Sequence, residues 1–121
     1  MFRIMLVYDD PDMIELIANF LSEKSFEIAT AADGEEALEM TGKGQQFAVI
    51  IASQYLPKSG AEKLLQALRQ AGNQTPVIMI SRRIGDIEDS EFDNAGFTGV
   101  FKWPFNLKAD LLPLIQKALQ P

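Results

Sequence analysis

The stretch Phe47-Ala-Val-Ile-Ile-Ala-Ser-Gln-Tyr-Leu-Pro57 decides the fold. It begins with six consecutive apolar residues, rich in β-branched side chains, and then turns polar at Ser53. An uninterrupted apolar run of this length is typical of a strand that is buried on both faces, as in the middle of a parallel sheet. In open parallel sheets, functional side chains gather at the carboxyl ends of the strands. Position 53 is therefore the most informative position in the sequence, and it is a serine.

Further apolar runs of similar character lie on both sides of this stretch and alternate with helix-like segments. The runs predict strands at 2–8, 26–30, 75–80 and 99–102, in addition to 47–52. The intervening segments predict helices at 11–24, 33–41, 59–71, 86–94 and 106–119, of which 86–94 has the weakest pattern. This alternation predicts a (βα)5 flavodoxin-like fold, in which a five-stranded parallel sheet carries helices on both faces. The length of 121 residues predicts a single domain over 1–121.

Local signals mark where several helices begin or are interrupted. Asp33 with Glu36, and Ser59 with Glu62, each have the three-residue spacing of a capping box. Pro113 lies inside the last predicted helix and removes one backbone donor. We therefore expect that helix to be kinked or to restart near Pro113.

Composition excludes several classes of function. The chain has no histidine and no cysteine, so it cannot form a Ser-His-Asp triad, a thiol nucleophile or a thiolate or histidine metal site. Its net charge of −6 argues against direct binding of nucleic acid. No apolar run is long enough to span a bilayer. These features fit a cytoplasmic protein that has no membrane association.

Several short motifs occur in a fixed order along the chain. Acids followed by Pro-Asp end the first predicted strand, and Leu56-Pro57 follows the third. The others are Ala32-Asp-Gly-Glu-Glu-Ala-Leu38, Thr75-Pro-Val-Ile-Met-Ile-Ser81 and Pro104-Phe105. Together, the motifs resemble the receiver domain of two-component response regulators along the whole chain.

The resemblance implies a particular phosphotransfer site. In the family, carboxylates at strand ends hold Mg²⁺, and an Asp that ends the third strand accepts a phosphoryl group from a histidine kinase. A Ser or Thr that ends the fourth strand, and a Lys before the Pro that follows the fifth, contact the phosphoryl oxygens. Metal and Lys offset the charge of the crowded carboxylates and of the transferred group.

The first strand keeps part of this set. Aligned on Pro11, the first family acid falls on Tyr8, and the second, a direct metal ligand, falls on Asp9. Asp10 occupies the next position, which is usually also acidic. Two interpretations of Asp9 and Asp10 stay open: a weak, vestigial Mg²⁺ site, or helix capping alone.

The acceptor position has lost its carboxylate. Aligned on Pro57, the acceptor falls on Ser53, whereas counting back from Gly60 gives Ala52, because the intervening loop is one residue short. Neither residue is an acid. Ser53 has no histidine to activate it as a nucleophile, so we interpret it as a small polar filler.

The remaining pocket residues are also altered. Ser81 keeps the hydroxyl at the end of the fourth strand, but Trp103 stands directly before Pro104, where the family has Lys. Lys102 is one place earlier, and a shift of one residue along a strand turns a side chain to the other face. Acceptor, cation and one acid are therefore missing together, which is typical of a scaffold that has lost its phosphorylation chemistry.

We therefore predict a pseudo-receiver, a non-enzymatic signalling module that requires no cofactor and acts by contact with protein. Its partner would be a histidine kinase, another regulator or an output domain. Candidate contact surfaces are the last strand and helix, where a homodimer is one option, and the first helix near Met13, Leu16 and Phe20. For both surfaces, core packing is the favoured interpretation and partner binding the alternative. Two alternatives stay open: a receiver that is phosphorylated at a non-standard site, and a small enzyme or cofactor binder on the same fold.

Overall fold

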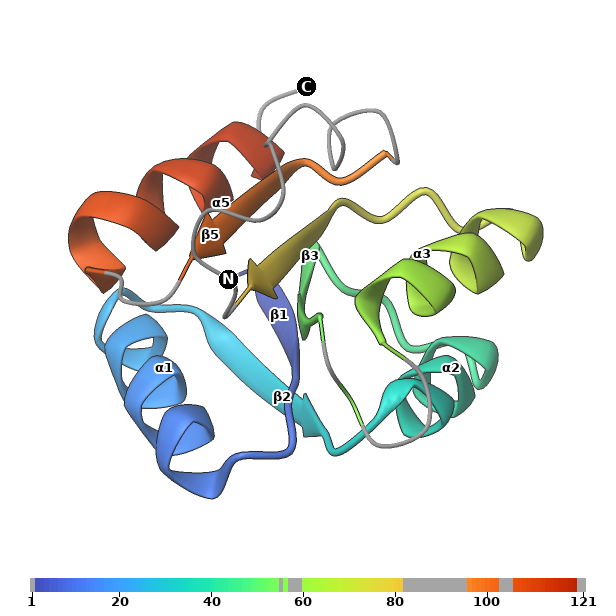
Figure 1. Cartoon of the computed structure of the whole chain (residues 1–121), viewed down its shortest axis with the longest axis horizontal. Helices are drawn as coiled ribbons and strands as arrows, with labels where there is room; N and C mark the ends of the chain where they lie inside the picture. Colours follow the sequence, from blue (N-terminus) through green and yellow to red (C-terminus); the bar gives the residue numbers. More distant parts are fainter. Residues whose placement is uncertain (1, 55, 57–59, 82–95, 103–105, 120–121) are drawn as a thin grey trace.

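Five parallel strands form one sheet in the order β2-β1-β3-β4-β5 (Figure 1). The computed structural model describes residues 2–54, 56, 60–81, 96–102 and 106–119, with the backbone alone at 101–102. The strands are β1 (Arg3–Val7), β2 (Glu27–Ala31), β3 (Val49–Ser53), β4 (Val77–Ser81) and β5 (Gly99–Lys102). The helices are α1 (Pro11–Glu23), α2 (Gly34–Gly42), α3 (Ala61–Gln70), a π-helical turn η1 (Leu107–Leu111) and α5 (Leu112–Leu119). The predicted (βα)5 sheet is confirmed, and the helix predicted at 86–94 lies outside the described residues.

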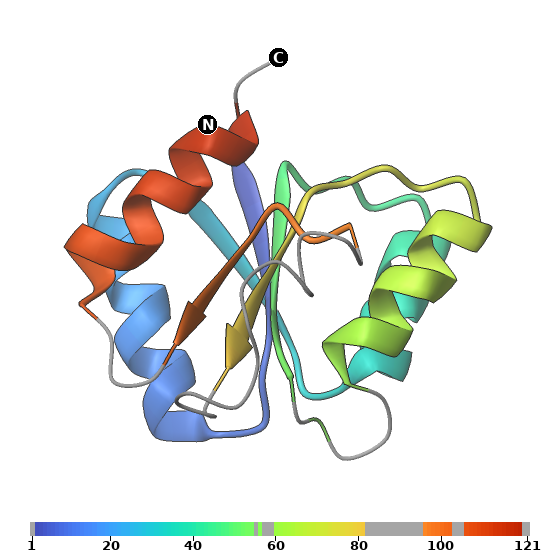
Figure 2. The same ribbon diagram turned by 45° about the horizontal axis from the view of Figure 1, so that its top comes forward.

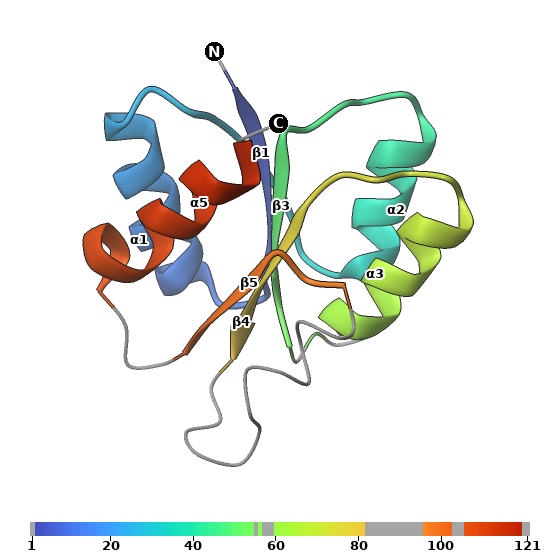
Figure 3. The ribbon, with the colours of Figure 1, turned by 90° about the horizontal axis from the view of Figure 1, so that it is seen from above.

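Helices cover both faces of the sheet, as Figures 2 and 3 show: α1 and α5 on one side, α2 and α3 on the other. Each face has its own buried cluster. Ile50 belongs to the cluster under α2 and α3 (the α2/α3 cluster), and Ile51 belongs to the cluster under α1 and α5 (the α1/α5 cluster). All five residues of β3 are buried, which confirms the strand that the opening stretch predicts. Among the described helices, none combines the length and the apolar character that crossing a bilayer requires.

The two predicted capping boxes have different outcomes. Asp33 caps α2 by accepting from the Glu36 amide at 2.9 Å, and the Glu36 carboxylate accepts from the amide of Ala32, one residue before the cap. The prediction for Ser59 as the cap of α3 is wrong. The N-cap of α3 is Gly60, which makes no side-chain hydrogen bond.

A close backbone approach explains why glycine stands at the start of α3. A Cβ placed on Gly60 would collide with the backbone carbonyl oxygen of Gln54, which follows directly after β3. The backbone of Gly60 is extended and tolerates any residue, so the constraint is steric. The contact brings the start of α3 against the carboxyl end of β3.

Substitution of Gly60 by Ala is expected to destabilise the protein by about 1–3 kcal/mol, because the added methyl group meets backbone that has no room to yield. Gly42 is the matched control, since a Cβ there meets nothing within 4 Å. Gly42→Ala, at the last residue of α2, is expected to be neutral or to stabilise by up to about 1 kcal/mol. Urea unfolding of both variants measures the difference. Equal effects would contradict the close approach.

The end of α3 is tied to the strand that follows it. The Arg69 guanidinium donates through Nη1 to the carbonyl oxygens of Asn73 at 2.8 Å and Thr75 at 2.9 Å. Partial burial lowers the pKa of Arg69 below its ordinary value. Gly72 lies in the chain between Arg69 and these acceptors with φ of +82°, which is a conformation that glycine adopts without strain. This connection anchors the start of β4, whose other end carries Ser81.

The last helix restarts near the proline, as predicted. Asn106 accepts from the amide of Ala109, and its own amide donates to Asp110 at 2.7 Å, so the two side chains secure the π-helical turn. The α-helical part begins at Leu112, which places Pro113 in the first turn of α5. A missing backbone donor is tolerated in the first turn of a helix.

Candidate functional site

The carboxyl ends of the strands meet at one edge of the sheet, where Tyr8 and Ser53 are neighbours. Val7 of β1 pairs with Ala52 of β3. On its other side, β1 stays paired with β2, because the amide of Tyr8 donates to the carbonyl oxygen of Ala31. One residue beyond the pair of Val7 and Ala52, Tyr8 is level with Ser53. Ser53 in turn pairs with Ile80 of β4. Tyr8, Ser53 and Ile80 form what we call the carboxyl-end row.

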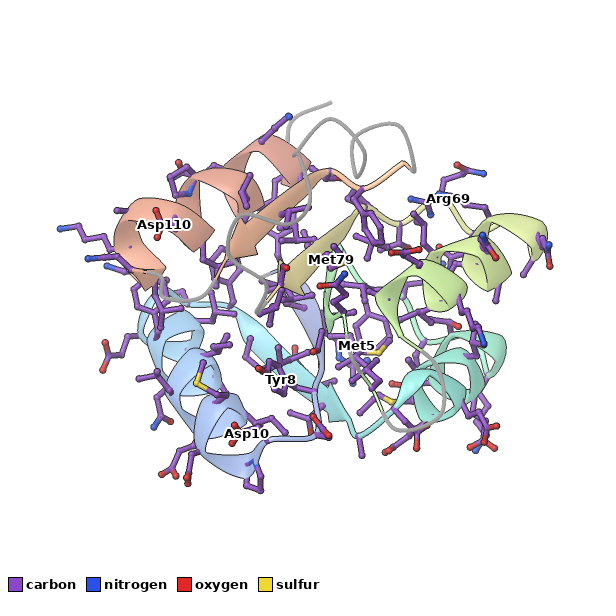
Figure 4. The ribbon with its side chains drawn as sticks, viewed as in Figure 1. Met5, Tyr8, Asp10, Arg69, Met79 and Asp110 are labelled. Atoms are coloured by element: carbon purple, nitrogen blue, oxygen red, sulfur yellow. The ribbon has the colours of Figure 1, made fainter. Side chains whose placement is uncertain are left out.

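The side chains of the carboxyl-end row lie on the face that α1 and α5 cover. Tyr8 and Ile80 belong to the α1/α5 cluster, and strand alternation places Ser53 on the same face as Ile51. Figure 4 shows Tyr8 on the side of the sheet that α1 covers, whereas Met5 faces α2 and α3. Ser53 thus has a buried aromatic side chain on one side and a buried aliphatic one on the other.

The burial of this row differs from what a phosphoacceptor requires. Tyr8 is 2% exposed and Ser53 is 4% exposed. A phosphoryl group on Ser53 would carry its charge into these apolar surroundings, which is costly without a paired cation. Ala52, the other aligned candidate, packs in the α2/α3 cluster, while Ser53 is the last residue of β3.

The two acids after β1, Asp9 and Asp10, have different surroundings. Asp10 is the N-cap of α1, and its Oδ1 accepts from the amides of Asp12 at 3.1 Å and Met13 at 3.3 Å. Asp9 is exposed. Across the described parts of the chain, no three acidic side chains gather as they would around a metal ion. Capping explains Asp10, and weak Mg²⁺ binding at Asp9 and Asp10 stays a prediction.

The hydroxyl at the end of β4 makes a contact that the sequence did not suggest. Ser81 is 1% exposed, and its Oγ donates to Oε1 of Gln54 at 3.0 Å. The side chain of Gln54 carries no distinctive sequence signal, because it is simply a glutamine that follows a buried strand. Lys102 ends β5 and pairs with Ser81 in the backbone register, while Trp103 lies outside the described residues.

The candidate contact surfaces differ in how much apolar surface they leave exposed. On α1, Leu16 is 51% exposed, whereas Met13 and Phe20 are half-buried against the α1/α5 cluster. Next to β5, Phe97 is buried in the α2/α3 cluster and therefore belongs to the core. Leu16 is thus the apolar side chain most open to a partner on α1.

A cleft of about 630 Å³ opens at the opposite end of the sheet. It lies between the loops that follow α2 and α3, with Phe47 and Leu68 among its apolar lining and Gln45 and Gln74 among its polar lining. None of its described lining residues is charged, but the Arg69 guanidinium lies beside it, donating to the carbonyl oxygens of the lining residues Asn73 and Thr75. The cleft contains none of the residues that the sequence predicts as a site.

Comparison with known proteins gives a consistent result. The model of the response regulator receiver domain family matches residues 4–115. The uncharacterized transcriptional regulatory protein YcbL of Bacillus subtilis is 30% identical over 119 residues, covering 96% of this chain and 52% of that protein. The transcriptional regulatory protein CpxR of Escherichia coli is 31% identical over 104 residues, covering 86% of this chain and 44% of that one. The chain therefore spans about half the length of these relatives.

Solved structures agree with the fold. The chemotaxis response regulator CheY4 of Vibrio cholerae superposes with a TM-score of 0.85 at 28% identity, covering 98% of this chain and 99% of that one. The receiver domain of the Francisella response regulator 1452 has a TM-score of 0.89 at 23% identity, covering 98% and 97% of the two chains. Both coverages extend over nearly the whole of each chain.

Proposed function

The chain belongs to the response regulator receiver family of two-component signalling, and we propose that it acts there as a pseudo-receiver. In this proposal it accepts no phosphoryl group at the end of β3 and transmits its signal through contact with protein. It performs no catalysis and needs no cofactor.

The observation that carries the proposal is the buried carboxyl-end row. Ser53 stands at the end of β3 at 4% exposure, between Tyr8 and Ile80. The family chemistry needs a carboxylate acceptor with a metal and a cation beside it. Here the acceptor position holds an alcohol, and a buried phenol takes the place of one acid.

The partners we propose follow from the family and from the relatives. The matched relatives carry the names of transcriptional regulatory proteins and are about twice as long as the matched segment. We propose that this chain binds a histidine kinase, another regulator or an output domain. Its candidate surfaces are the exposed side of α1 at Leu16 and the region of β5 and α5, through which a homodimer would form.

The test exposes the purified protein to acetyl phosphate and Mg²⁺ and measures its intact mass. We expect no added phosphoryl group, because no acceptor carboxylate ends β3, whereas a receiver with an intact acceptor Asp, treated in parallel, gains one. A backbone NMR titration with Mg²⁺ and then beryllofluoride is expected to leave the amides of Ser53 and Ser81 unshifted on the second addition.

The variant Ser53→Ala identifies the site if a phosphoryl group does appear. Phosphate on the wild type that is lost in Ser53→Ala would establish a receiver modified at a non-standard residue. Phosphate retained in that variant would place the acceptor elsewhere, for example on Asp9. Either result overturns the pseudo-receiver.

A further inference from the structure

A hydrogen bond joins the carboxyl ends of β3 and β4 through side chains. Oγ of Ser81 donates to Oε1 of Gln54 at 3.0 Å, although the two residues are 27 positions apart. Ser81 is 1% exposed. A buried hydroxyl that loses its partner incurs the full desolvation penalty, so such a bond constrains the local structure more than one at the surface.

The backbone of Gln54 is fixed on two sides. Its amide donates to the carbonyl oxygen of Ile80 at 2.8 Å, which extends the pairing of β3 with β4 by one residue. Its carbonyl oxygen lies against Gly60, where a Cβ would collide with it. The carboxamide therefore starts from a restrained backbone, which lowers the entropy cost of holding it against Ser81.

We propose that Gln54 is an internal latch, which occupies the hydroxyl of Ser81 with a neutral oxygen and holds the ends of β3 and β4 together without a phosphoryl group. A serine hydroxyl has one proton to donate. While Ser81 donates it to Gln54, the same proton is not available to an external oxyanion. The inference rests on the proposed function, because it names what takes the place of the phosphoryl group at that site.

The chemistry of the latch suits a protein that signals in one conformation. The carboxamide is uncharged, so it satisfies Ser81 without the cation and metal that a bound phosphoryl group requires. A phosphoryl group is added and removed, whereas Gln54 is part of the chain. The β3–β4 edge therefore keeps the same arrangement in the presence and absence of a kinase.

A double-mutant cycle tests the latch. The variants are Gln54→Ala, Ser81→Ala and the double variant, each unfolded in urea. We expect a coupling of about fivefold to tenfold in the unfolding equilibrium constant, so that the double variant is less destabilised than the sum of the single ones. Gln66→Ala is the matched control, because Gln66 is an exposed glutamine on α3. Gln66→Ala combined with Ser81→Ala is expected to show no coupling.

Amide hydrogen exchange gives a second measurement, which is local. In Gln54→Ala, the amides of residues 54 and 81 are expected to exchange at least about fivefold faster than in the wild type, while those of α2 keep their rates. Ser81→Thr retains a hydroxyl and is expected to preserve the coupling to Gln54, which Ser81→Ala abolishes.

The outcomes separate the latch from the proposed function. Additivity of Gln54→Ala and Ser81→Ala, with unchanged exchange at residues 54 and 81, would overturn the latch, whatever the phosphorylation assay gives. A phosphoryl group on the wild-type protein would overturn the pseudo-receiver, even when the coupling is present. Coupling together with faster local exchange supports the latch.

Discussion

Replacement of Tyr8 by Asp lowers the free energy of unfolding by about 3–5 kcal/mol, the range that applies to removal of a large buried ring. Tyr8 is 2% exposed and packs in the α1/α5 cluster. The substitution removes the ring, which leaves a cavity, and introduces a carboxylate among apolar neighbours. The family motif has an acid at this position, so this variant restores the family residue and is nevertheless expected to destabilise the protein more than Tyr8→Phe does.

Tyr8→Phe is the control for this prediction. It keeps the ring and removes only the hydroxyl, so its expected cost is at most about 1.5 kcal/mol. Urea unfolding with and without Mg²⁺ measures both variants. If Tyr8→Asp unfolds like the wild type, or gains stability from Mg²⁺, position 8 is an accessible acid site after all. The buried carboxyl-end row would then no longer support the pseudo-receiver.

Substitutions in the middle of β3 are expected to have a similarly large effect. Ile50→Ala and Ile51→Ala are each expected to cost about 2–4 kcal/mol. Both side chains are 0% exposed, Ile50 against the α2/α3 cluster and Ile51 against the α1/α5 cluster. Because the strand is covered on both faces, the two substitutions are expected to lower the free energy of unfolding by about the same amount.

Thr30→Ala on the edge strand β2 is the matched control, since Thr30 is exposed. Its expected effect is within about 0.5 kcal/mol of the wild type. Thermal or urea unfolding of the three variants compares them directly. A small cost for either Ile50→Ala or Ile51→Ala would mean that one face of β3 is open to solvent, which contradicts the observed layers.

These stability experiments bear on the proposed function, because that proposal rests on the same burial that stabilises the fold. The side chains of the α1/α5 cluster extend to the carboxyl end of the sheet at Tyr8 and Ile80. We propose that a site filled by core residues in this way supports no phosphorylation. Such a domain is suited to presenting a constant surface, and Leu16 on α1 offers an apolar contact there.

The sequence by itself determined the fold class and predicted that no acid stands at the acceptor position. Consecutive apolar residues at 47–52 can be satisfied only by burial on both faces, and β3 is indeed buried throughout. Asp33 and Glu36 were predictable as capping residues because a cap depends on positions three or four apart. The absence of an acid at positions 52 and 53 was readable as soon as the motifs were aligned, since that comparison needs residue identity alone.

Only the tertiary structure decided what surrounds Ser53. The neighbours of Ser53 come from β1 and β4, and the pairing register that brings them together is not encoded in any local spacing. The contact between Gln54 and Ser81 likewise joins residues that are 27 positions apart. The N-cap of α3 is Gly60, where a Cβ would collide with the Gln54 carbonyl oxygen, and this constraint arises across the loop and has no local sequence pattern. Short-range patterns specify strands and helices, whereas side chains become a site only when the packed sheet places distant residues side by side.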